Sequence, residues 1–425
     1  MSTISSIRES FQNIWRNKEI RDKLRFSLLV IVIFRVMAAV PVPGVPLDAL
    51  KQFFGNSGFG EVMSLVSGGV LENATLVAIG LGPYINASVI FQLLGSVIPK
   101  IEELQKEGAQ GRRVINMYTR LLTVPLAILQ SFVIYSVLQR YGIMAKLEPM
   151  DLVNMVATMT AGAVLMMWMG ELVTEKGFGG GSSLLIFAGI LAGIPGSLQT
   201  NISDMGPSDV ATLVISSLII IAVVIFVTQA ERQVPIQFAR RVRAVGPTVE
   251  SSIPIKLNQA GVMPVIFAMS LLSFPQLIAQ FLTGGNIPQA VQDVSGWVVT
   301  QLTNQVTYNI ILFVAIVGFS FFYTFVVFNP NHVAENLQKQ AAFIPGVRPG
   351  KQTVKYLTAS AGRLAIVGSL FLASVAILPE LATESGILSR SIISGTGLLI
   401  MVGVILDVRR QISSMIVTRS YESYL

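Results

Sequence analysis

Few side chains in this 425-residue sequence could carry out covalent chemistry. Cysteine is absent, which excludes disulfides, thiolate nucleophiles and cysteine-ligated metals, and His332 is the single histidine. No catalytic residue, metal ligand or cofactor is therefore expected. The motif GxxxxGK[ST], which binds nucleotide phosphates, does not occur, so the chain is not expected to hydrolyse ATP itself. These observations argue against an enzyme.

Arginine is the residue whose placement points to binding. The relevant side chains are Arg232, Arg240, Arg241 and Arg243 in the polar stretch 231–258, and Arg348 in the stretch 329–358. Around Arg348, Pro and Gly alternate in the sequence FIPGVRPG, which predicts a stiff turn with the arginine at its tip. Connections this long are usually functional, and basic loops can dock an acidic surface, RNA or anionic lipid. The alternative is that these cations only set membrane topology.

The elements that position these loops are predicted to be membrane spans. Charged residues make up 12% of the chain and apolar residues 52%, whereas about 25% charged residues is usual in a soluble domain. A bilayer core needs roughly 20 apolar residues per helix. Ten spans are predicted, at 24–40, 76–98, 121–138, 152–170, 177–198, 210–227, 257–282, 310–328, 364–378 and 392–406. The first carries Arg25 and Arg35, and the last two reach spanning length with their flanks.

The cations are distributed unevenly over the connections between these runs. Twenty-five of the 30 Lys and Arg residues lie on the side that holds both termini, four lie on the other side, and Arg35 lies inside the first run. Loops rich in Lys and Arg stay in the cytoplasm. Both termini are therefore predicted to be cytoplasmic.

Ten spans divide into an N-terminal half, 1–200, and a C-terminal half, 201–425. Because five is an odd number, the second half must be inverted relative to the first, a plan common in transport proteins. The alternative is ten helices without internal symmetry. Between the first two spans, Gly60–Asn73 is mildly apolar but too short to cross, so it is either a re-entrant half-helix or an external interfacial helix.

No acidic residue lies inside a predicted span, which weakens the case for a proton-driven transporter. A small-solute secondary transporter with inverted repeats remains the alternative, because such carriers can use backbone carbonyls. Asn86, Gln130 and Asn258 are uncharged polar residues in or at the start of spans. Hydrogen bonds between spans contribute only about 0.6 kcal/mol on average, which suits an interface that must open, although ordinary helix packing also uses them.

Several motifs, in order and at matching span positions, resemble those of the bacterial SecY family, the central subunits of the Sec protein translocase. They are Pro41-Val42-Pro43-Gly44, Ser67-Gly68-Gly69, Gly82-Pro83-Tyr84-Ile85, Gly111-Arg112-Arg113, Ile186-Phe187-Ala188-Gly189-Ile190, Ala260-Gly261-Val262-Met263-Pro264, Phe328-Asn329-Pro330 and the PGVRPG loop at 345–350. The resemblance covers nearly the whole chain. Two positions depart from it: Gly180 replaces a family asparagine, and Leu81 replaces an isoleucine.

The resemblance implies an all-α polytopic membrane protein with ten transmembrane helices in two inverted five-helix halves plus a short re-entrant plug helix at about 60–72. The implied plug residues are Glu61, Val62, Met63, Ser64, Leu65, Val66, Ser67, Gly68, Gly69 and Val70. The implied pore ring consists of Leu81, Ile85, Ile186, Ile266 and Ile400. Leu81 and Ile85 are four residues apart and would share one helix face.

The implied function is a protein-conducting channel that passes unfolded secretory chains and releases apolar segments sideways into lipid. Asn86, Gln130 and Asn258 map to the polar cluster of its lateral gate, which lies between spans two and three and spans seven and eight. The loops 231–258 and 329–358 map to docking sites, with Arg240, Arg241 and Arg348 as the matching arginines. The resemblance implies as partners SecE and SecG, the SecA motor ATPase, the ribosome, secretory and membrane protein substrates and anionic lipid, all at the bacterial inner membrane.

Overall fold

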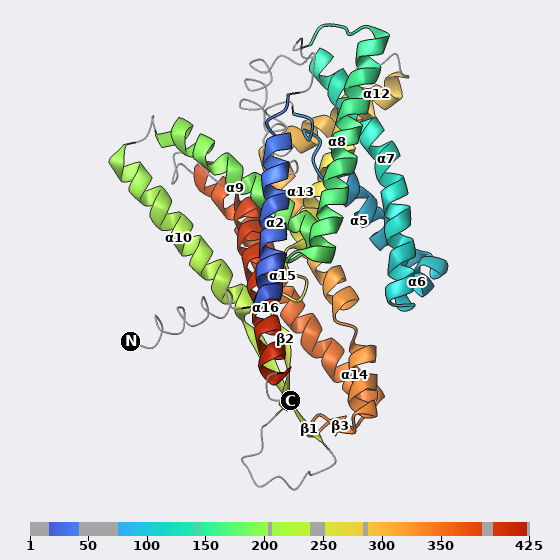
Figure 1. Ribbon diagram of the computed structural model, residues 1–425, viewed down its shortest axis with the longest axis vertical. Helices are drawn as coiled ribbons and strands as arrows, with labels where there is room; N and C mark the ends of the chain where they lie inside the picture. The colour runs from blue at the N-terminus through green and yellow to red at the C-terminus, as the bar shows by residue number, and fades with distance from the viewer. Residues whose placement is uncertain are drawn as a thin grey trace. The chain divides into compact units, whose positions relative to one another are not determined.

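The computed structural model describes residues 17–41, 75–140, 142, 144–202, 206–238, 251–283, 288–384 and 394–422 (Figure 1). The helices are α2 (Lys18–Met37), α5 (Gly82–Val97), α6 (Pro99–Lys106), α7 (Ala109–Arg140), α8 (Pro149–Lys176), α9 (Gly181–Ile202), α10 (Pro207–Gln229), α11 (Met263–Leu282), α12 (Gln289–Thr303), α13 (Gln305–Val327), α14 (Pro330–Lys339), α15 (Lys351–Glu384) and α16 (Gly395–Glu422). Three short strands, β1 (Glu231–Phe238), β2 (Ser251–Lys256) and β3 (Ala342–Phe343), complete the described elements.

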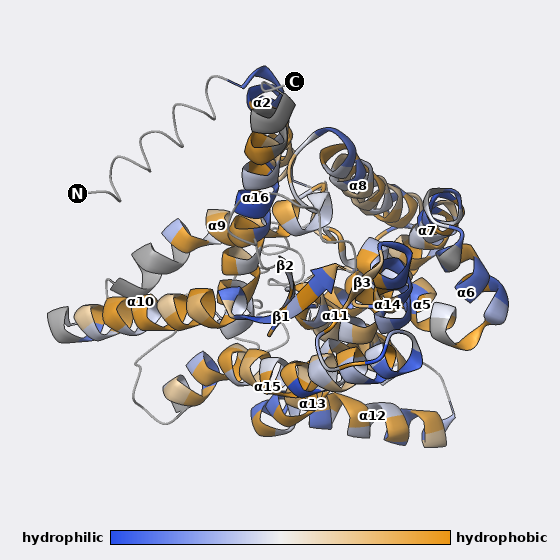
Figure 2. Ribbon diagram, turned by 90° about the horizontal axis from the view of Figure 1, so that it is seen from below, coloured by the Kyte–Doolittle hydropathy of each residue, from blue (hydrophilic) through white to orange (hydrophobic). Residues whose placement is uncertain are grey.

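Each of the ten predicted apolar runs falls largely on a helix, in order α2, α5, α7, α8, α9, α10, α11, α13, α15 and α16. Within the described residues, six helices are long and apolar enough to cross a bilayer, namely α7, α8, α10, α11, α13 and α15. The pair α5 and α6, bent by 106°, would make a seventh. The count of ten spans therefore stays a prediction. Figure 2 shows α10 as hydrophobic along nearly its whole length, whereas α6 and α14 are largely hydrophilic.

Three features of the chain were not predicted. The loop regions contain the short helices α6, α12 and α14 and a three-stranded sheet of order β2-β1-β3. His332 lies in α14 and not in a loop. The seventh span was predicted to begin at residue 257, but α11 begins at Met263, because a turn at Gly261, with a φ of 66°, interrupts the chain just before it.

The described chain divides into two compact units. The first consists of residues 1–200, 269–308 and 404–425, and the second of residues 201–268 and 309–403. In the first unit, α5, α7 and α8 pack together around a core that contains Ala78, Val133 and Met159. Gly162 of α8 lies directly against the backbone carbonyl of Leu76, where no side chain larger than that of glycine would fit.

The second unit is built around the sheet and helix α15. Strands β1 and β2 are antiparallel with Val234 opposite Ile253, and β3 pairs with the other edge of β1 through Phe238 and Ala342. Val234 and Ile255 are buried with Leu357 of α15 in a second apolar core. The sheet is therefore anchored to the N-terminal end of α15.

A glycine-rich connection, Gly179-Gly180-Gly181, joins α8 to α9 in the first unit. The hydroxyl of Thr174 accepts a hydrogen bond from the N–H of Gly181 at 2.9 Å and donates one to the carbonyl of Gly170 at 2.9 Å. A side chain on Gly181 would meet the carbonyl oxygen of Gly170, whereas one on Gly180 would be 3.6 Å from the Ser183 hydroxyl, an ordinary contact. Gly179 has a φ of 76°, and its N–H donates to the Gln411 side chain at 2.7 Å.

Gly180 and Gly181 are therefore expected to respond differently to substitution. Gly181→Ala should lower the free energy of unfolding by about 1–3 kcal/mol, because the added methyl group would clash with the carbonyl oxygen of Gly170. Gly180→Ala and Gly180→Asn should both be tolerated, since that position has room. Thermal unfolding of the detergent-solubilised variants measures the difference. Equal destabilisation at positions 180 and 181 would contradict the packing described.

Candidate functional site

The five residues of the predicted pore ring are all buried, and each is at most 6% exposed. Leu81 is the residue before α5, and the N–H of Ile85 donates to its carbonyl at 2.9 Å, so the two lie one helical turn apart. Ile186 lies in α9, Ile266 in α11 and Ile400 in α16. The first three belong to the first compact unit and the last two to the second. Their assembly into one ring stays a prediction.

The polar residues assigned to the lateral gate are also buried, with Asn86 and Gln130 in the first unit and Asn258 in the second. The amide oxygen of Gln130 has no hydrogen-bond partner among the described groups. A buried acceptor left unpaired costs about 1–3 kcal/mol. Asn258 lies in the turn before α11, where its side-chain N–H donates to the carbonyl of Gly261 at 3.1 Å. Asn258 thus stabilises the turn that leads into α11 without being part of the helix.

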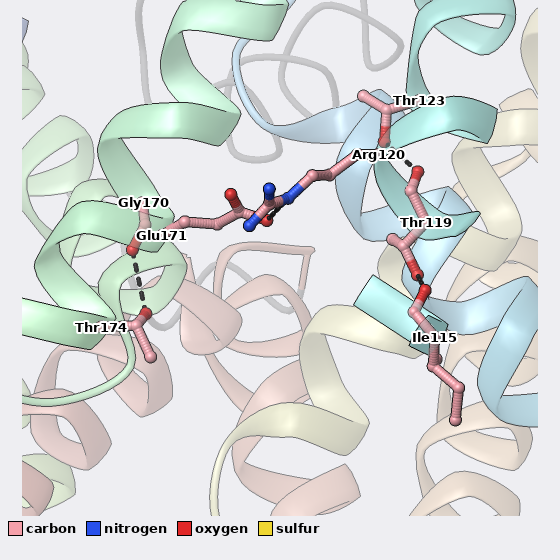
Figure 3. Close-up of polar contacts among 7 residues, drawn as sticks. All are labelled: Ile115, Thr119, Arg120, Thr123, Gly170, Glu171 and Thr174. Atoms are coloured by element: carbon pink, nitrogen blue, oxygen red, sulfur yellow. Dashed lines mark hydrogen bonds and ion pairs between the residues drawn. The ribbon is translucent and has the colours of Figure 1, made fainter. Parts of the chain in front are cut away.

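An ion pair that was not predicted joins α7 to α8 (Figure 3). The Nε of Arg120 donates to Oε1 of Glu171 at 2.7 Å. Arg120 directly precedes the third predicted span and Glu171 directly follows the fourth, so opposite charges beside neighbouring spans were the available signal. Thr119 and Thr123, on either side of Arg120, donate to carbonyls of their own helix, which leaves the ion pair as the polar link between the two helices in this view.

The turn that carries Arg348 is held on both sides. The N–H of Val347 donates to the carbonyl of Ile344 at 3.0 Å, and the hydroxyl of the buried Thr353 donates to the carbonyl of Arg348 at 3.0 Å. Ile344 is buried in the core with Leu357, and Val347 packs against that core. Arg348 is exposed, and no ion pair to it is found within the described part of the chain. A rigid turn therefore presents this guanidinium to the solvent.

Helix α14, which precedes this turn in the chain, carries further polar groups. Asn329 caps this helix by accepting hydrogen bonds from the N–H groups of Asn331 and His332. Lys339 pairs with Glu335 at 2.8 Å and lowers the pKa of that carboxyl, first through the hydrogen bond and then through its charge. The positive charge of Lys339 is thus compensated locally, unlike that of Arg348.

Two groups of predicted site residues lie outside the described residues. They are the plug residues 61–70 and the arginine pair Arg240 and Arg241. Among the residues that the structure describes, no group of three or more His, Asp or Glu side chains could hold a metal ion.

Breaking the ion pair should loosen the packing of α7 on α8. We expect Arg120→Ala and Glu171→Ala each to lower the thermal midpoint, with a coupling of about 0.5–1 kcal/mol in the double mutant, because the half-exposed arginine is partly screened by water. Arg113→Ala removes an exposed cation from the same helix and serves as the control. Additive single effects would show that the pair does not couple the helices.

Comparison with known proteins gives consistent matches over most of the chain. The SecY family model matches residues 75–409. The protein translocase subunit SecY of Mycobacterium tuberculosis is 40% identical over 441 residues, which cover 98% of this chain and 99% of the relative. The SecY subunit of Halalkalibacterium halodurans is 39% identical over 432 residues, again with 98% and 99% covered.

Solved structures with the same fold are channels. A structure described as that of a protein conducting channel has a TM-score of 0.68 at 19% identity and covers 93% of this chain and 92% of its own. Sec61 from the canine ribosome-channel complex of the endoplasmic reticulum has a TM-score of 0.66 at 18% identity, with the same coverage. These likenesses agree with an all-α polytopic fold. The match to the family model and the near-complete alignment with its relatives show that the chain belongs to the SecY family of protein translocase subunits.

Proposed function

We propose that this chain passes unfolded secretory proteins across the bacterial inner membrane and releases apolar segments sideways into lipid, driven by the SecA motor or by the translating ribosome. The observation that carries the proposal is the match to the SecY family model over residues 75–409, and the burial of the five apolar residues predicted to form the pore ring is compatible with it. A narrow apolar collar hinders ions because hydration is unfavourable there, and it offers a passing chain no polar group to bind. Such a constriction can therefore close around a moving polypeptide.

Family membership makes the chain a subunit of a protein-conducting translocation channel, a multi-pass membrane protein and not an enzyme. It gives no support to the alternative of a small-solute transporter. The finer arrangement that we propose has ten spans in two inverted halves, 1–200 and 201–425, with both termini in the cytoplasm. The distribution of 25 cations against four supports this orientation.

We further propose that SecE and SecG are the small membrane subunits that associate with this chain. At its cytoplasmic loops, the proposed partners are anionic lipid, SecA and the ribosome. The exposed, uncompensated Arg348 on its anchored turn supports docking there. The canine Sec61 and yeast Ssh1 structures, whose folds are similar, are described as ribosome complexes. Co-purification of one- or two-span subunits from membranes tests the assignment of the small partners.

Deletion of residues 60–72 should raise the ion conductance of the idle channel in planar bilayers, because the proposed plug would no longer close the external side. Replacement of the same residues by a Gly/Ser linker of equal length separates loss of the plug from shortening of the loop. Conductance equal to that of the parent in both variants would contradict the plug assignment.

Arg348→Glu should lower SecA-driven translocation of a secretory precursor into membrane vesicles by about ten-fold or more, since interface energy is usually concentrated in a few residues. Lys355→Glu makes the same charge change at another exposed residue of this region and should have a smaller effect. The amount of each variant in the membrane is measured in parallel. Normal transport by Arg348→Glu would reject the docking role.

A further inference from the structure

Helix α11 belongs to two compact units. Residues 263–268 are part of the second unit, where the ring of Phe267 makes edge contacts with Phe319 at 6.4 Å and Tyr323 at 5.8 Å. Residues 269–282 are part of the first unit. Pro275 lies within the helix and removes a backbone N–H, which makes this the weakest point of its hydrogen-bond ladder. The two ends of α11 therefore pack in different units, and its backbone hydrogen-bond ladder is interrupted within the C-terminal part.

The C-terminal half of α11 is attached to α7 by apolar contacts. Leu277 is buried in the core formed with Val133, Ile134 and other residues of α7 and α8. Phe281 makes an edge contact with Phe132 of α7, with ring centroids 5.7 Å apart. In lipid, contacts of this kind hold two helices only weakly, because acyl chains can replace the lost apolar surface.

Arg140, the last residue of α7, adds a polar attachment at the same place. Its Nη1 donates to the carbonyl of Gln280 at 2.5 Å and to the hydroxyl of Thr283 at 3.1 Å, and its Nη2 donates to the carbonyl of Phe281 at 3.1 Å. The last carbonyls of a helix have no partner within the helix. The hydroxyl of Thr283 also donates to the carbonyl of Gln280 at 2.9 Å, so the guanidinium fork of Arg140 adds a second donor there and supplies one to the carbonyl of Phe281.

We infer that Arg140 is the latch that holds α7 and α11 together at the external end of the lateral gate, and that it must release the carbonyls of Gln280 and Phe281 before an apolar segment can leave sideways. This inference rests on the proposed lateral release. The polar latch sets the threshold for lateral release because, once it opens, the carbonyl of Phe281 loses its Arg140 donor and the carbonyl of Gln280 keeps only the hydroxyl of Thr283, at 2.9 Å. Lysine could supply the charge but not the planar fork that reaches three acceptors.

The experiment measures gate separation directly. Because the parent chain has no cysteine, Leu129→Cys on α7 and Leu271→Cys on α11 provide two unique, exposed spin-label sites. The distance between the labels is measured by pulsed electron paramagnetic resonance in the translocase complex in lipid nanodiscs. The variants are Arg140→Gln, Arg140→Lys and, as a matched control, Lys146→Gln, which removes an exposed cation from the loop after α7.

In Arg140→Gln, the population with a longer label distance should rise about ten-fold, the change expected on loss of a hydrogen bond from a charged donor. Arg140→Lys should lie between Arg140→Gln and the parent, and Lys146→Gln should match the parent. Thermal unfolding of each complex is measured alongside, so that a distance change in a misfolded variant is recognised. A folded Arg140→Gln with the parent's distance distribution would overturn the latch.

A second measurement separates the latch from the proposed function. Model segments of graded leucine content are tested for insertion into the membrane by vesicles that contain each variant. The latch predicts that Arg140→Gln inserts segments less apolar than the parent requires. If the parent inserts segments and Arg140→Gln requires the same leucine content as the parent, the latch alone is rejected. If the parent inserts no segment at all, lateral release itself is rejected.

Discussion

Inside a bilayer every main-chain N–H and C=O group must find its partner within the protein, because lipid offers none. Helices meet this requirement along their length but not at their ends. The described chain satisfies several of these ends with side chains from other positions. The Thr174 hydroxyl bridges the end of α8 and the start of α9, the guanidinium of Arg140 donates to carbonyls in the last turn of α11, and Asn329 caps α14. The ends of these helices are therefore held by polar contacts, even where the helices themselves are mostly apolar.

The same constraint explains why close backbone contacts recur in the packing. Apolar side chains gain little from leaving lipid for another apolar surface, so helices in membranes associate through small residues and shape. Gly162 meets the carbonyl of Leu76, and in the other unit Gly368 meets the carbonyl of Leu257. Gly403 meets the side chain of Val262 in a similar way. These close contacts at glycines therefore contribute to helix packing in both units.

The sequence predicted the features that depend on composition and local order. The ten apolar runs coincide with helices because each run is long, and the family resemblance rested on motifs spread over the whole chain. The contacts of Arg120 with Glu171 and of Arg140 with Gln280 were not predicted, because the partners are 51 and 140 residues apart. Opposite charges at the ends of neighbouring spans hint at the first contact, whereas nothing in the sequence marks the Gln280 carbonyl as the partner of Arg140. The sheet was missed because the alternation of Val234 and Ile236 with polar residues is too short to separate from a loop.

The turn that carries Arg348 has a mechanical consequence. Ile344, four residues before the arginine, shares one core with Phe328, the residue after α13, and with Leu357, in the second turn of α15. A force applied to the tip of the turn is therefore transmitted through this shared core to the ends of two long helices. A displacement of this turn would therefore involve the end of α13 and the start of α15 at the same time.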